Sequence, residues 1–271
     1  MKKVIQFIIL GLLAVLTLTL VAGCGSDTAA PQSKVIKVGV TAGPHAELMD
    51  EVKKLAEKQG LKIEVVEFND YIQPNVALNQ GDIDVNSFQH EPYLNNIVKD
   101  RGFDIVSIGK TVIFPMGVYS KKVKDLAQLN DGGTVIIPND PTNGGRALLL
   151  LEQKGIIKLK AGAGLTASAA DIAENPKHLV FKELDAAQIP RSLDDVDAAA
   201  INTNYAVTAG LNPVKDAIAL EGGDSPYSNI IAVRGKDKDN ADYQKLVKIY
   251  QSAEIKAFIQ EHFKGSVVAG W

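Results

Sequence analysis

Cysteine is almost absent from this sequence, since Cys24 is the only one among 271 residues. A single cysteine excludes a disulfide framework within the chain and a zinc site built on several cysteines. A domain of this length also needs no such cross-links, because it buries enough apolar surface to fold without them. What matters about Cys24 is therefore its position in the chain.

An excess of basic residues is also absent. Lysine and arginine number 29 against 32 aspartates and glutamates, which gives a formal net charge of −3. Binding to nucleic acid depends on clustered lysine and arginine side chains. The mildly acidic composition therefore argues against a nucleic-acid partner.

The familiar motifs of catalysis and nucleotide binding are missing as well. The sequence holds no G-x-S-x-G, no G-x-x-x-x-G-K-[ST] and no G-x-G-x-x-G. No two of the four histidines lie four residues apart, the spacing that a two-histidine metal site on a helix requires. The sequence therefore predicts no enzyme, no cofactor and no metal site. The histidines are His45, His90, His178 and His262.

The first 24 residues have the pattern of a bacterial lipoprotein signal. Lys2 and Lys3 precede an almost wholly apolar run over residues 4–21, and the sequence V-A-G-C ends at Cys24. Small residues before the cysteine are what a secretory cleavage site requires. In such signals the cysteine sulfur takes up a diacylglycerol and becomes part of the mature N-terminus, so we predict lipidation of Cys24. The alternative is an uncleaved signal-anchor helix, because the apolar run approaches the length of a membrane span.

Cleavage before Cys24 defines the mature chain. It removes residues 1–23 with Lys2 and Lys3 but no acidic residue, so the net charge changes from −3 to −5. Residues 24–33 are small and polar and predict a flexible tether. No later apolar stretch is long enough to cross a bilayer. We therefore expect a protein held outside the cytoplasm, in the periplasm or at the cell surface, by its lipid alone.

The remaining sequence alternates between strand and helix patterns. A β-rich run at residues 35–40, an amphipathic helix at 47–59 and an alternating strand at 61–68 form a βαβ unit, which predicts a parallel sheet. Further expected elements are helix 74–81, strand 82–85, helix 92–101, strands within 104–120, strand 134–137, helix 145–154, strands 198–201 and 229–233, and one long helix 241–263.

These elements fall into two blocks, which β-rich segments near residues 112–120 and 225–233 connect. We therefore predict an α/β fold with two lobes, each a mainly parallel sheet covered by helices. Lobe 1 is expected to comprise residues 34–113 and 229–271, and lobe 2 residues 114–228. Two connections place a hinge at the base of a cleft that closes around a ligand. A single continuous α/β sheet would give similar patterning.

The first candidate binding segment is Asn139–Arg146, between strand 134–137 and a helix expected to begin at Gly145. Ligands of α/β proteins bind at the carboxyl ends of parallel strands. A helix start presents unpaired N–H groups to an anion, and the planar guanidinium of Arg146 suits a carboxylate. The alternative is that Arg146 pairs with a neighbouring acidic side chain.

The second candidate segment, residues 86–94, carries Phe88, His90 and Tyr93 between a strand and a helix. Tyr71 occupies the comparable loop of the preceding unit. Together these rings would line a slot for the apolar part of a ligand. Taken singly, each aromatic residue would more often belong to the core.

The third candidate group consists of asparagines that follow or precede strands. Asn202 and Asn204 come directly after strand 198–201, and Asn229 opens strand 229–233. A side-chain amide accepts from an ammonium and donates to a carboxylate. The alternative for one of Asn202 and Asn204 is an Asx turn or a helix cap. One arginine, several amides and an aromatic slot together suit a small zwitterion with an apolar side chain, an α-amino acid.

Several longer motifs resemble one known family, the NlpA-type methionine-binding lipoproteins, which are the receptors of methionine ABC importers. The motifs are F-N-D-Y at 68–71, G-D-I-D at 81–84, F-Q-H at 88–90, P-Y-L at 92–94, P-N-D-P-T-N at 138–143, P-R-S-L-D-D at 190–195, I-N-T at 201–203 and S-P-Y at 225–227. The resemblance runs from the signal sequence to Trp271 and implies a two-lobed periplasmic-binding-protein fold, of the type with two crossing strands.

The resemblance also implies roles for the candidate residues. Arg146 would hold the ligand carboxylate, while Asn229 and either Asn202 or Asn204 would hold the backbone groups. The thioether would lie among the rings of Phe88, His90, Tyr93 and Tyr71. One departure is Gly144, where the family often carries leucine, and an extra glycine there is expected to loosen the loop or widen the pocket.

The implied function is capture of methionine, in its L form, its D form or both, for delivery to an ABC permease and its ATPase. The implied receptor is a monomer. Two alternatives remain for the ligand and the role. The ligand would instead be a methionine-containing dipeptide or another small amino acid, or the chain would be a surface adhesin without a role in transport.

Overall fold

The computed structural model describes residues 35–222 and 225–271. The chain separates into two compact units, Met1–Lys34 and Val35–Trp271, and the described residues belong to the second. The predicted signal, the lipidation of Cys24 and the tether lie outside the described residues.

The first half of the described chain and its C-terminal part share one five-stranded sheet, in the order β2-β1-β3-β13-β4. Its strands are β1 (Ile36–Thr41), β2 (Ile63–Phe68), β3 (Val85–Asn86), β4 (Ile105–Lys110) and β13 (Ile230–Arg234). Strand β1 pairs in parallel with β2 and β3, whereas β13 is antiparallel to both β3 and β4. Four strands therefore run in one direction, and β13 alone is reversed.

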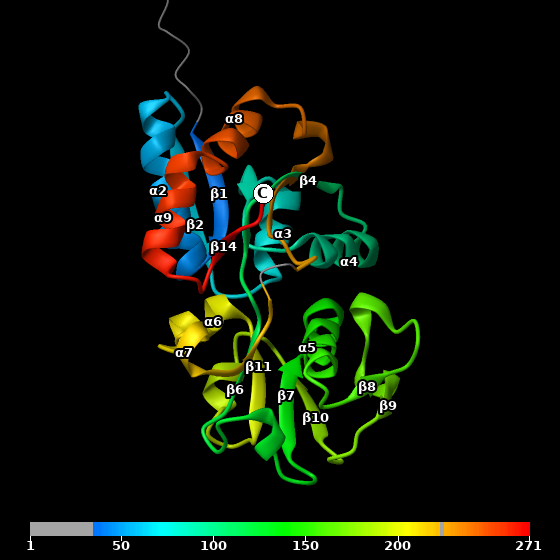
Figure 1. Ribbon diagram of the computed structural model, residues 1–271. Coiled ribbons are helices and arrows are strands. Elements are labelled where there is room, and N and C mark those ends of the chain that lie inside the picture. Colours follow the sequence, from blue (N-terminus) through cyan, green and yellow to red (C-terminus); the bar gives the residue numbers. More distant parts are fainter. Residues whose placement is uncertain (1–34, 223–224) are drawn as a thin grey trace, which may run out of the picture. The chain divides into compact units, whose positions relative to one another are not determined.

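The middle of the chain forms a second five-stranded sheet of the same design, in the order β10-β7-β11-β6-β12. Its strands are β6 (Gly117–Tyr119), β7 (Thr134–Pro138), β10 (Val180–Leu184), β11 (Ala198–Ile201) and β12 (Ala217–Leu220). Here β6 is the reversed strand, since it is antiparallel to β11 and β12. The chain leaves the first sheet after β4 and enters the second sheet at β6. It leaves the second sheet after β12 and returns to the first at β13, so in each sheet the reversed strand is the one that receives the chain from the other sheet. The two-lobed, mainly parallel α/β fold is confirmed (Figure 1).

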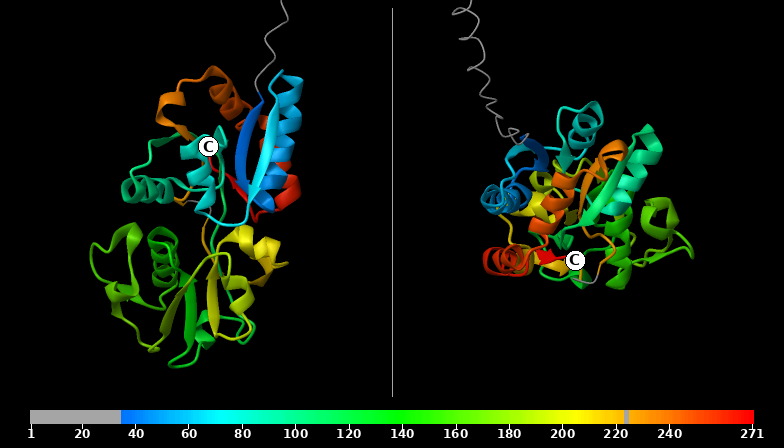
Figure 2. Two further views of the ribbon diagram at one scale, coloured as in Figure 1. Left: turned by 180° about the vertical axis from the view of Figure 1, so that it is seen from behind. Right: turned by 90° about the horizontal axis from the view of Figure 1, so that it is seen from above.

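Helices cover both faces of the first sheet. One face packs on α2 (Pro44–Lys58), α8 (Ala241–Tyr250) and α9 (Ala253–Phe263). The other face packs on α3 (Gln73–Gln80) and α4 (Glu91–Arg101), through an apolar cluster that includes Leu78 and Leu94. Seen from behind in Figure 2, α9 lies beside α2 although some 200 residues separate them in sequence.

The second sheet is likewise covered on both faces. Helix α5 (Pro141–Gln153) buries Leu148, Leu150 and Leu151 in one cluster, and α6 (Thr203–Thr208) contributes Ala206 to the other. The remaining elements are α7 (Pro213–Asp216), the strand pairs β5 (Val112–Ile113) with β14 (Val268–Ala269) and β8 (Lys158–Leu159) with β9 (Ile172–Glu174), and five short 3-10 helices at Leu126–Gln128, Gly164–Thr166, Ala169–Asp171, Ile189–Ser192 and Gly235–Asp237. No helix in residues 35–222 and 225–271 is long and apolar enough to span a bilayer.

Two helix predictions were wrong. Helix α5 begins at Pro141 rather than Gly145, because Asp140 caps it by accepting the N–H of Asn143 and the following proline favours a first helical position. The expected long C-terminal helix is two helices, because Ser252 accepts the N–H of Ile255 and so starts a new helix after Gln251.

The backbone of Gly145 allows α5 to pack closely on the loop that follows it. A Cβ at this position would lie 2.5 Å from the carbonyl oxygen of Leu165 and 2.8 Å from the nitrogen of Ala167. Backbone atoms cannot move aside as a flexible side chain would. The position therefore tolerates only glycine without a shift of α5.

Substitution Gly145→Ala is expected to lower the free energy of unfolding by about 1–3 kcal/mol, because the added methyl group overpacks this contact. Urea denaturation of the variant and the unmodified protein measures the difference. Gly222→Ala is the matched control, since a Cβ at Gly222 would meet nothing within 4 Å. Equal stability of the Gly145 variant and the unmodified protein would contradict the close approach.

Candidate functional site

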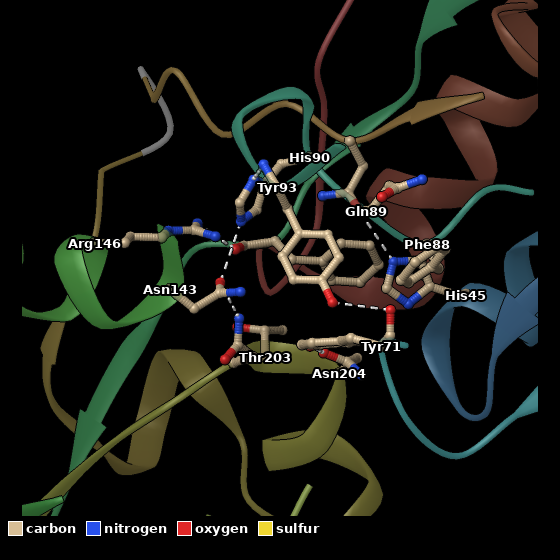
Figure 3. A pocket seen from close by; sticks show the side chains of 13 residues that line it. His45, Tyr71, Phe88, Gln89, His90, Tyr93, Asn143, Arg146, Thr203 and Asn204 are labelled. Carbon is tan, nitrogen blue, oxygen red and sulfur yellow. Dashed lines mark hydrogen bonds between the residues drawn. The ribbon is translucent and has the colours of Figure 1, made fainter. Parts of the chain in front are cut away.

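One pocket lies where the carboxyl ends of strands from both sheets face each other (Figure 3). Its unfilled space, including the part open to solvent, is about 350 Å³. All eight residues predicted from the sequence line it. The lining residues are His45, Tyr71, Phe88, Gln89, His90, Tyr93, Phe114, Asn143, Arg146, Asn202, Thr203, Asn204 and Asn229.

Aromatic rings form one wall of the pocket. The ring centroids of Tyr71 and Phe88 are 6.0 Å apart, and Tyr93 meets Phe88 edge to face at 6.3 Å. The hydroxyl of Tyr93 donates to the carbonyl oxygen of Tyr71 at 3.0 Å, which ties the two loops together. Tyr205, outside the lining, lies against Tyr71 with ring centroids 4.9 Å apart. The wall is therefore apolar and held in place from behind.

His90 is a neutral hydrogen-bonding residue at the N-terminal end of helix α4. Its Nδ1 accepts the N–H of Tyr93 at 3.1 Å, so the proton belongs on Nε2, which donates to Oδ1 of Asn143 at 3.2 Å. Burial, and next the positive charge of Arg146, lower the pKa of His90 to about 3. At neutral pH the ring therefore brings no charge to the pocket.

His45 is a second neutral histidine that hydrogen-bonds an asparagine of the pocket. It was not predicted from the sequence. Its Nδ1 lies 2.7 Å from Oγ1 of Thr41, and its Nε2 lies 3.2 Å from Oδ1 of Asn229. Burial lowers the pKa of His45 to about 4, against which the hydrogen bond to Asn229 acts only partly. The neutral ring orients the amide of Asn229, so that its oxygen faces the histidine and its nitrogen is left for another partner.

Two asparagine side chains, those of Asn202 and Asn204, each use only one of their two polar atoms in a hydrogen bond within the protein. The Nδ2 of Asn202 donates to Oδ1 of Asn143 at 2.8 Å, and Oδ1 of Asn204 accepts the hydroxyl of Tyr71 at 2.6 Å. The opposite atoms, Oδ1 of Asn202 and Nδ2 of Asn204, are buried without a hydrogen-bond partner among the described residues. An unpaired buried polar group costs about 1–3 kcal/mol. The pocket therefore offers one acceptor and one donor for which the protein supplies no partner.

The alternative that one of these asparagines serves as a cap is not what the structure shows. Asn202 does occupy the position before α6, but its side chain makes no capping hydrogen bond. Asn204 lies within α6 and faces the pocket. Both amides are therefore available to a ligand.

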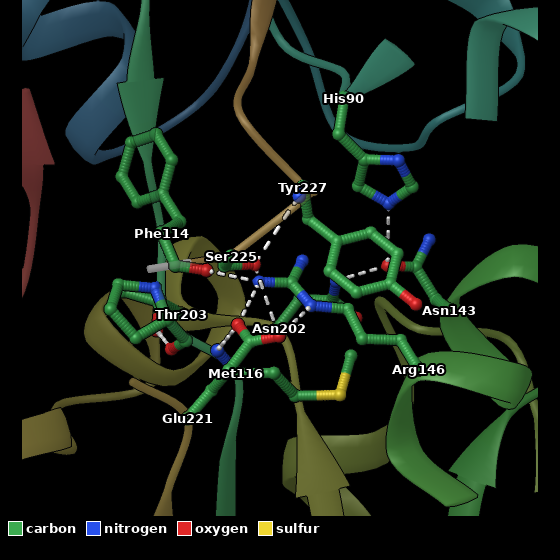
Figure 4. Close-up of polar contacts among 11 residues, drawn as sticks. His90, Phe114, Met116, Asn143, Arg146, Asn202, Thr203, Glu221, Ser225 and Tyr227 are labelled. Atoms are coloured by element: carbon green, nitrogen blue, oxygen red, sulfur yellow. Dashed lines mark hydrogen bonds and ion pairs between the residues drawn. The ribbon is translucent and has the colours of Figure 1, made fainter. Parts of the chain in front are cut away.

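Arg146 pairs with an acidic side chain, which was the alternative considered for it. Its Nε donates to Oε1 of Glu221 at 3.1 Å, and its Nη2 donates to Oε2 of Glu221 and to the carbonyl oxygen of Phe114 (Figure 4). The ring of Tyr227 covers the guanidinium, with its centroid 4.4 Å from Cζ. Among the described residues, Nη1 makes no hydrogen bond. Glu221 thus binds the edge of the guanidinium formed by Nε and Nη2, and Nη1 is left for another partner in the pocket.

Five lining residues escaped the sequence analysis. Asn143, Gln89 and Thr203 lie inside the motifs that were singled out, and His45 follows β1 as the other candidates follow their strands. The rule that residues directly after parallel strands gather at one edge of the sheet could therefore have identified these four residues. Phe114 lies in a connection between the sheets and carries no such signal.

Gly144 does not line the pocket. A Cβ there would lie 2.8 Å from the carbonyl oxygen of Pro138, so the residue faces the end of β7. Within the described residues, no group of three or more His, Cys, Asp or Glu side chains could hold a metal ion.

The sequence model of the NlpA lipoprotein family matches residues 36–271. The chain belongs to this family. The resemblance inferred from the motifs is thereby confirmed. The D-methionine-binding lipoprotein MetQ of Salmonella typhimurium (strain LT2) is 51% identical over 253 residues, which cover 92% of this chain and 93% of that protein. MetQ of Escherichia coli K12 is 49% identical over 252 residues, 92% of either chain.

Solved structures of similar proteins share the two-lobed fold. A nutrient-binding protein from Burkholderia cenocepacia bound to methionine is 60% identical, with a TM-score of 0.85 over 87% of this chain and 100% of that one. The methionine-binding protein MetQ is 49% identical, with a TM-score of 0.85 over 88% of this chain and 98% of that one. These relatives are named as binding proteins and not as enzymes.

The two buried histidines make stability depend on pH. Their pKa values in the folded state, about 4 for His45 and about 3 for His90, lie below the usual 6.5. The unfolded chain therefore binds protons that the folded chain does not, as pH falls below 6.5. Stability is complete above that pH and is lost progressively toward pH 4.

Between pH 6.5 and 5, the free energy of unfolding is expected to fall by about 1 kcal/mol per pH unit for each histidine. Urea denaturation across this range measures the slope, which His45→Gln should reduce by about half. His262→Gln is the control, since His262 is exposed and lies outside the pocket. Equal slopes for all three proteins would contradict the neutral, buried state of His45.

Proposed function

We propose that this chain captures methionine in the pocket and delivers it to an ABC importer. The observation that carries the proposal is the pair of unpaired buried atoms, Oδ1 of Asn202 and Nδ2 of Asn204, which lie in one pocket with Arg146 and an aromatic wall. An acceptor, two donors and an apolar slot match an ammonium, a carboxylate and an apolar side chain. The names of the similar proteins support methionine as the amino acid.

In this proposal the ligand backbone lies among the asparagines and Arg146. The carboxylate accepts from Nη1 of Arg146 and Nδ2 of Asn204, and the ammonium donates to Oδ1 of Asn202. Asn229 contributes its nitrogen, since His45 already uses its oxygen. A charge-assisted hydrogen bond of this kind contributes about 1.5–3 kcal/mol.

The ligand side chain lies against the rings of Phe88, Tyr93 and Tyr71, with His90 beside them. A thioether is polarizable and packs favourably against aromatic rings, at about 0.3–1.5 kcal/mol per contact. None of these rings carries a charge at neutral pH, because burial raises the pKa of Tyr71 well above 10 and lowers that of His90 to about 3. The slot therefore favours an uncharged, apolar side chain.

The proposal includes opening and closing of the pocket. The two hydrogen bonds from Tyr71 to Asn204 and from His90 to Asn143 connect residues that follow strands of different sheets. A ligand enters only when these bonds break, and it is enclosed when they re-form. We place the division between the moving lobes where the sequence predicts it, with residues 34–113 and 229–271 in lobe 1 and 114–228 in lobe 2.

The finer features of the receptor belong to the same proposal. Cys24 is the lipid-bearing residue, the chain acts outside the cytoplasm as a monomer, and its lipid is its one attachment to the membrane. The NlpA lipoprotein family supports this location. The receptor performs no catalysis of its own, and its protein partners are a permease and the attached ATPase.

Native mass spectrometry of purified residues 24–271 tests the ligand directly. A retained mass equal to methionine is expected, as is a rise in melting temperature with L-methionine, D-methionine or both. Glycyl-methionine and the other small amino acids serve as competitors. If a different amino acid or a dipeptide stabilises the protein and methionine does not, methionine is not the ligand.

Asn204→Asp tests the assigned contact with the carboxylate. The change replaces the unpaired donor Nδ2 by an acceptor, while the oxygen that accepts from Tyr71 remains. Affinity for methionine is expected to fall about 100-fold, because a charge-assisted hydrogen bond worth about 1.5–3 kcal/mol gives way to repulsion. Isothermal titration calorimetry measures the change.

Asn240→Asp is the matched control for this variant. Asn240 caps α8 by accepting the N–H groups of Asp242 and Tyr243, a role that aspartate fills equally well. Its affinity for methionine should equal that of the unmodified protein. Arg146 is less suited to this test, because its removal leaves Glu221 without its partner at a cost of about 3–5 kcal/mol. Unchanged affinity of the Asn204 variant would refute the contact.

A further inference from the structure

Glu221 does not line the pocket but pairs with a residue that does, Arg146. It follows the last residue of β12, its side chain is 12% exposed, and it lies behind Arg146 rather than in the lining. Both carboxylate oxygens accept from the guanidinium. The N–H of Met116 and the hydroxyl of Ser225 donate to the same carboxylate at 3.2 and 3.3 Å. These four donors hold the negative charge in one place.

The carboxylate of Glu221 offsets the one positive charge that lines the pocket, that of Arg146. Arg146 is the one lining residue that is charged at neutral pH, since both lining histidines are neutral. Two further carboxylates of the pocket loops, Asp70 and Asp140, accept backbone N–H groups near the starts of α3 and α5 and lie outside the lining. The pair of Arg146 and Glu221 therefore has a net charge of zero, with its positive end toward the pocket.

Such a pair acts differently on ligands of different charge. A carboxylate is attracted by Arg146 and repelled by Glu221 behind it, so that an anion gains less than it would from an isolated arginine. An ammonium is repelled by Arg146 and attracted by Glu221. In a zwitterion whose carboxylate faces Arg146, the attraction of Glu221 for the ammonium offsets its repulsion of the carboxylate. Because the site is buried, the surrounding solvent screens these interactions only weakly.

We propose that Glu221 is a specificity-determining residue, which makes the pocket select net-neutral zwitterions over anions by offsetting the charge of Arg146. The inference rests on the proposed binding of methionine. It adds a role for a side chain that touches Arg146 rather than the ligand.

Glu221→Gln tests the proposal, because it removes the charge and keeps the shape. Affinity is measured by calorimetry at pH 7 for three ligands with the same thioether chain: methionine, the anion 4-(methylthio)butanoate, and the cation methioninol. The variant should bind the anion on the order of tenfold more tightly and the cation on the order of tenfold more weakly. Methionine, which carries both charges, should change less than either.

A merely structural role of Glu221 gives a different result. If the glutamate only held Arg146 in place, its loss would weaken binding of the anion, so weaker or unchanged binding of 4-(methylthio)butanoate overturns the proposal. Glu183→Gln is the control for net charge, since Glu183 is exposed on β10 of the same sheet. It should leave all three affinities unchanged.

Three additional measurements separate the possible failures. Binding of methionine by the unmodified protein tests the proposed function alone, and its absence would end that proposal whatever Glu221 does. Glu221→Ala, which also lacks the charge, replaces the glutamine variant if that variant does not fold. Glu221→Asp retains the charge and should keep the ligand preference of the unmodified protein.

Discussion

The buried ion pair between Arg146 and Glu221 is the interaction on which the pocket depends. A buried charge is tolerated only when it is paired and its hydrogen bonds are satisfied. Here the pair brings together helix α5, the end of β12 and the connection at Phe114 and Met116, which are far apart in the sequence. The ring of Tyr227 closes the face of the guanidinium. What remains of Arg146 is one edge, aimed at the space that the other lining residues enclose.

Around this pair the pocket is polar but uncharged. Burial keeps both histidines neutral, so each acts as an oriented donor that fixes a neighbouring amide, His90 acting on Asn143 and His45 on Asn229. A buried polar network is stable only when its members are satisfied. Oδ1 of Asn202 and Nδ2 of Asn204 are buried in this network without a partner among the described residues, and both residues line the pocket, which is why these two atoms are informative.

Much of the site could be predicted from the sequence because of one topological rule. Residues that directly follow parallel strands gather at one edge of a sheet, and this placed Tyr71, Phe88 and Asn202 in a single pocket before any contact was known. The start of α5 could also have been read correctly, since Asp140 followed by Pro141 is a cap followed by a favoured first residue. The break between α8 and α9 depends on Ser252, a single capping residue within a continuous apolar pattern.

The sequence by itself determined the family, the two-lobed α/β architecture and eight of the residues around the pocket, because local patterns and strand order carry that information. Only the tertiary structure decided what Arg146 can do. Its partner lies 75 residues away, after a short strand that no local pattern indicated, and it is the approach of those two segments that leaves a single edge of the guanidinium free. The protonation states of His45 and His90 were decided in the same way, since they follow from burial, and burial is a property of the folded chain.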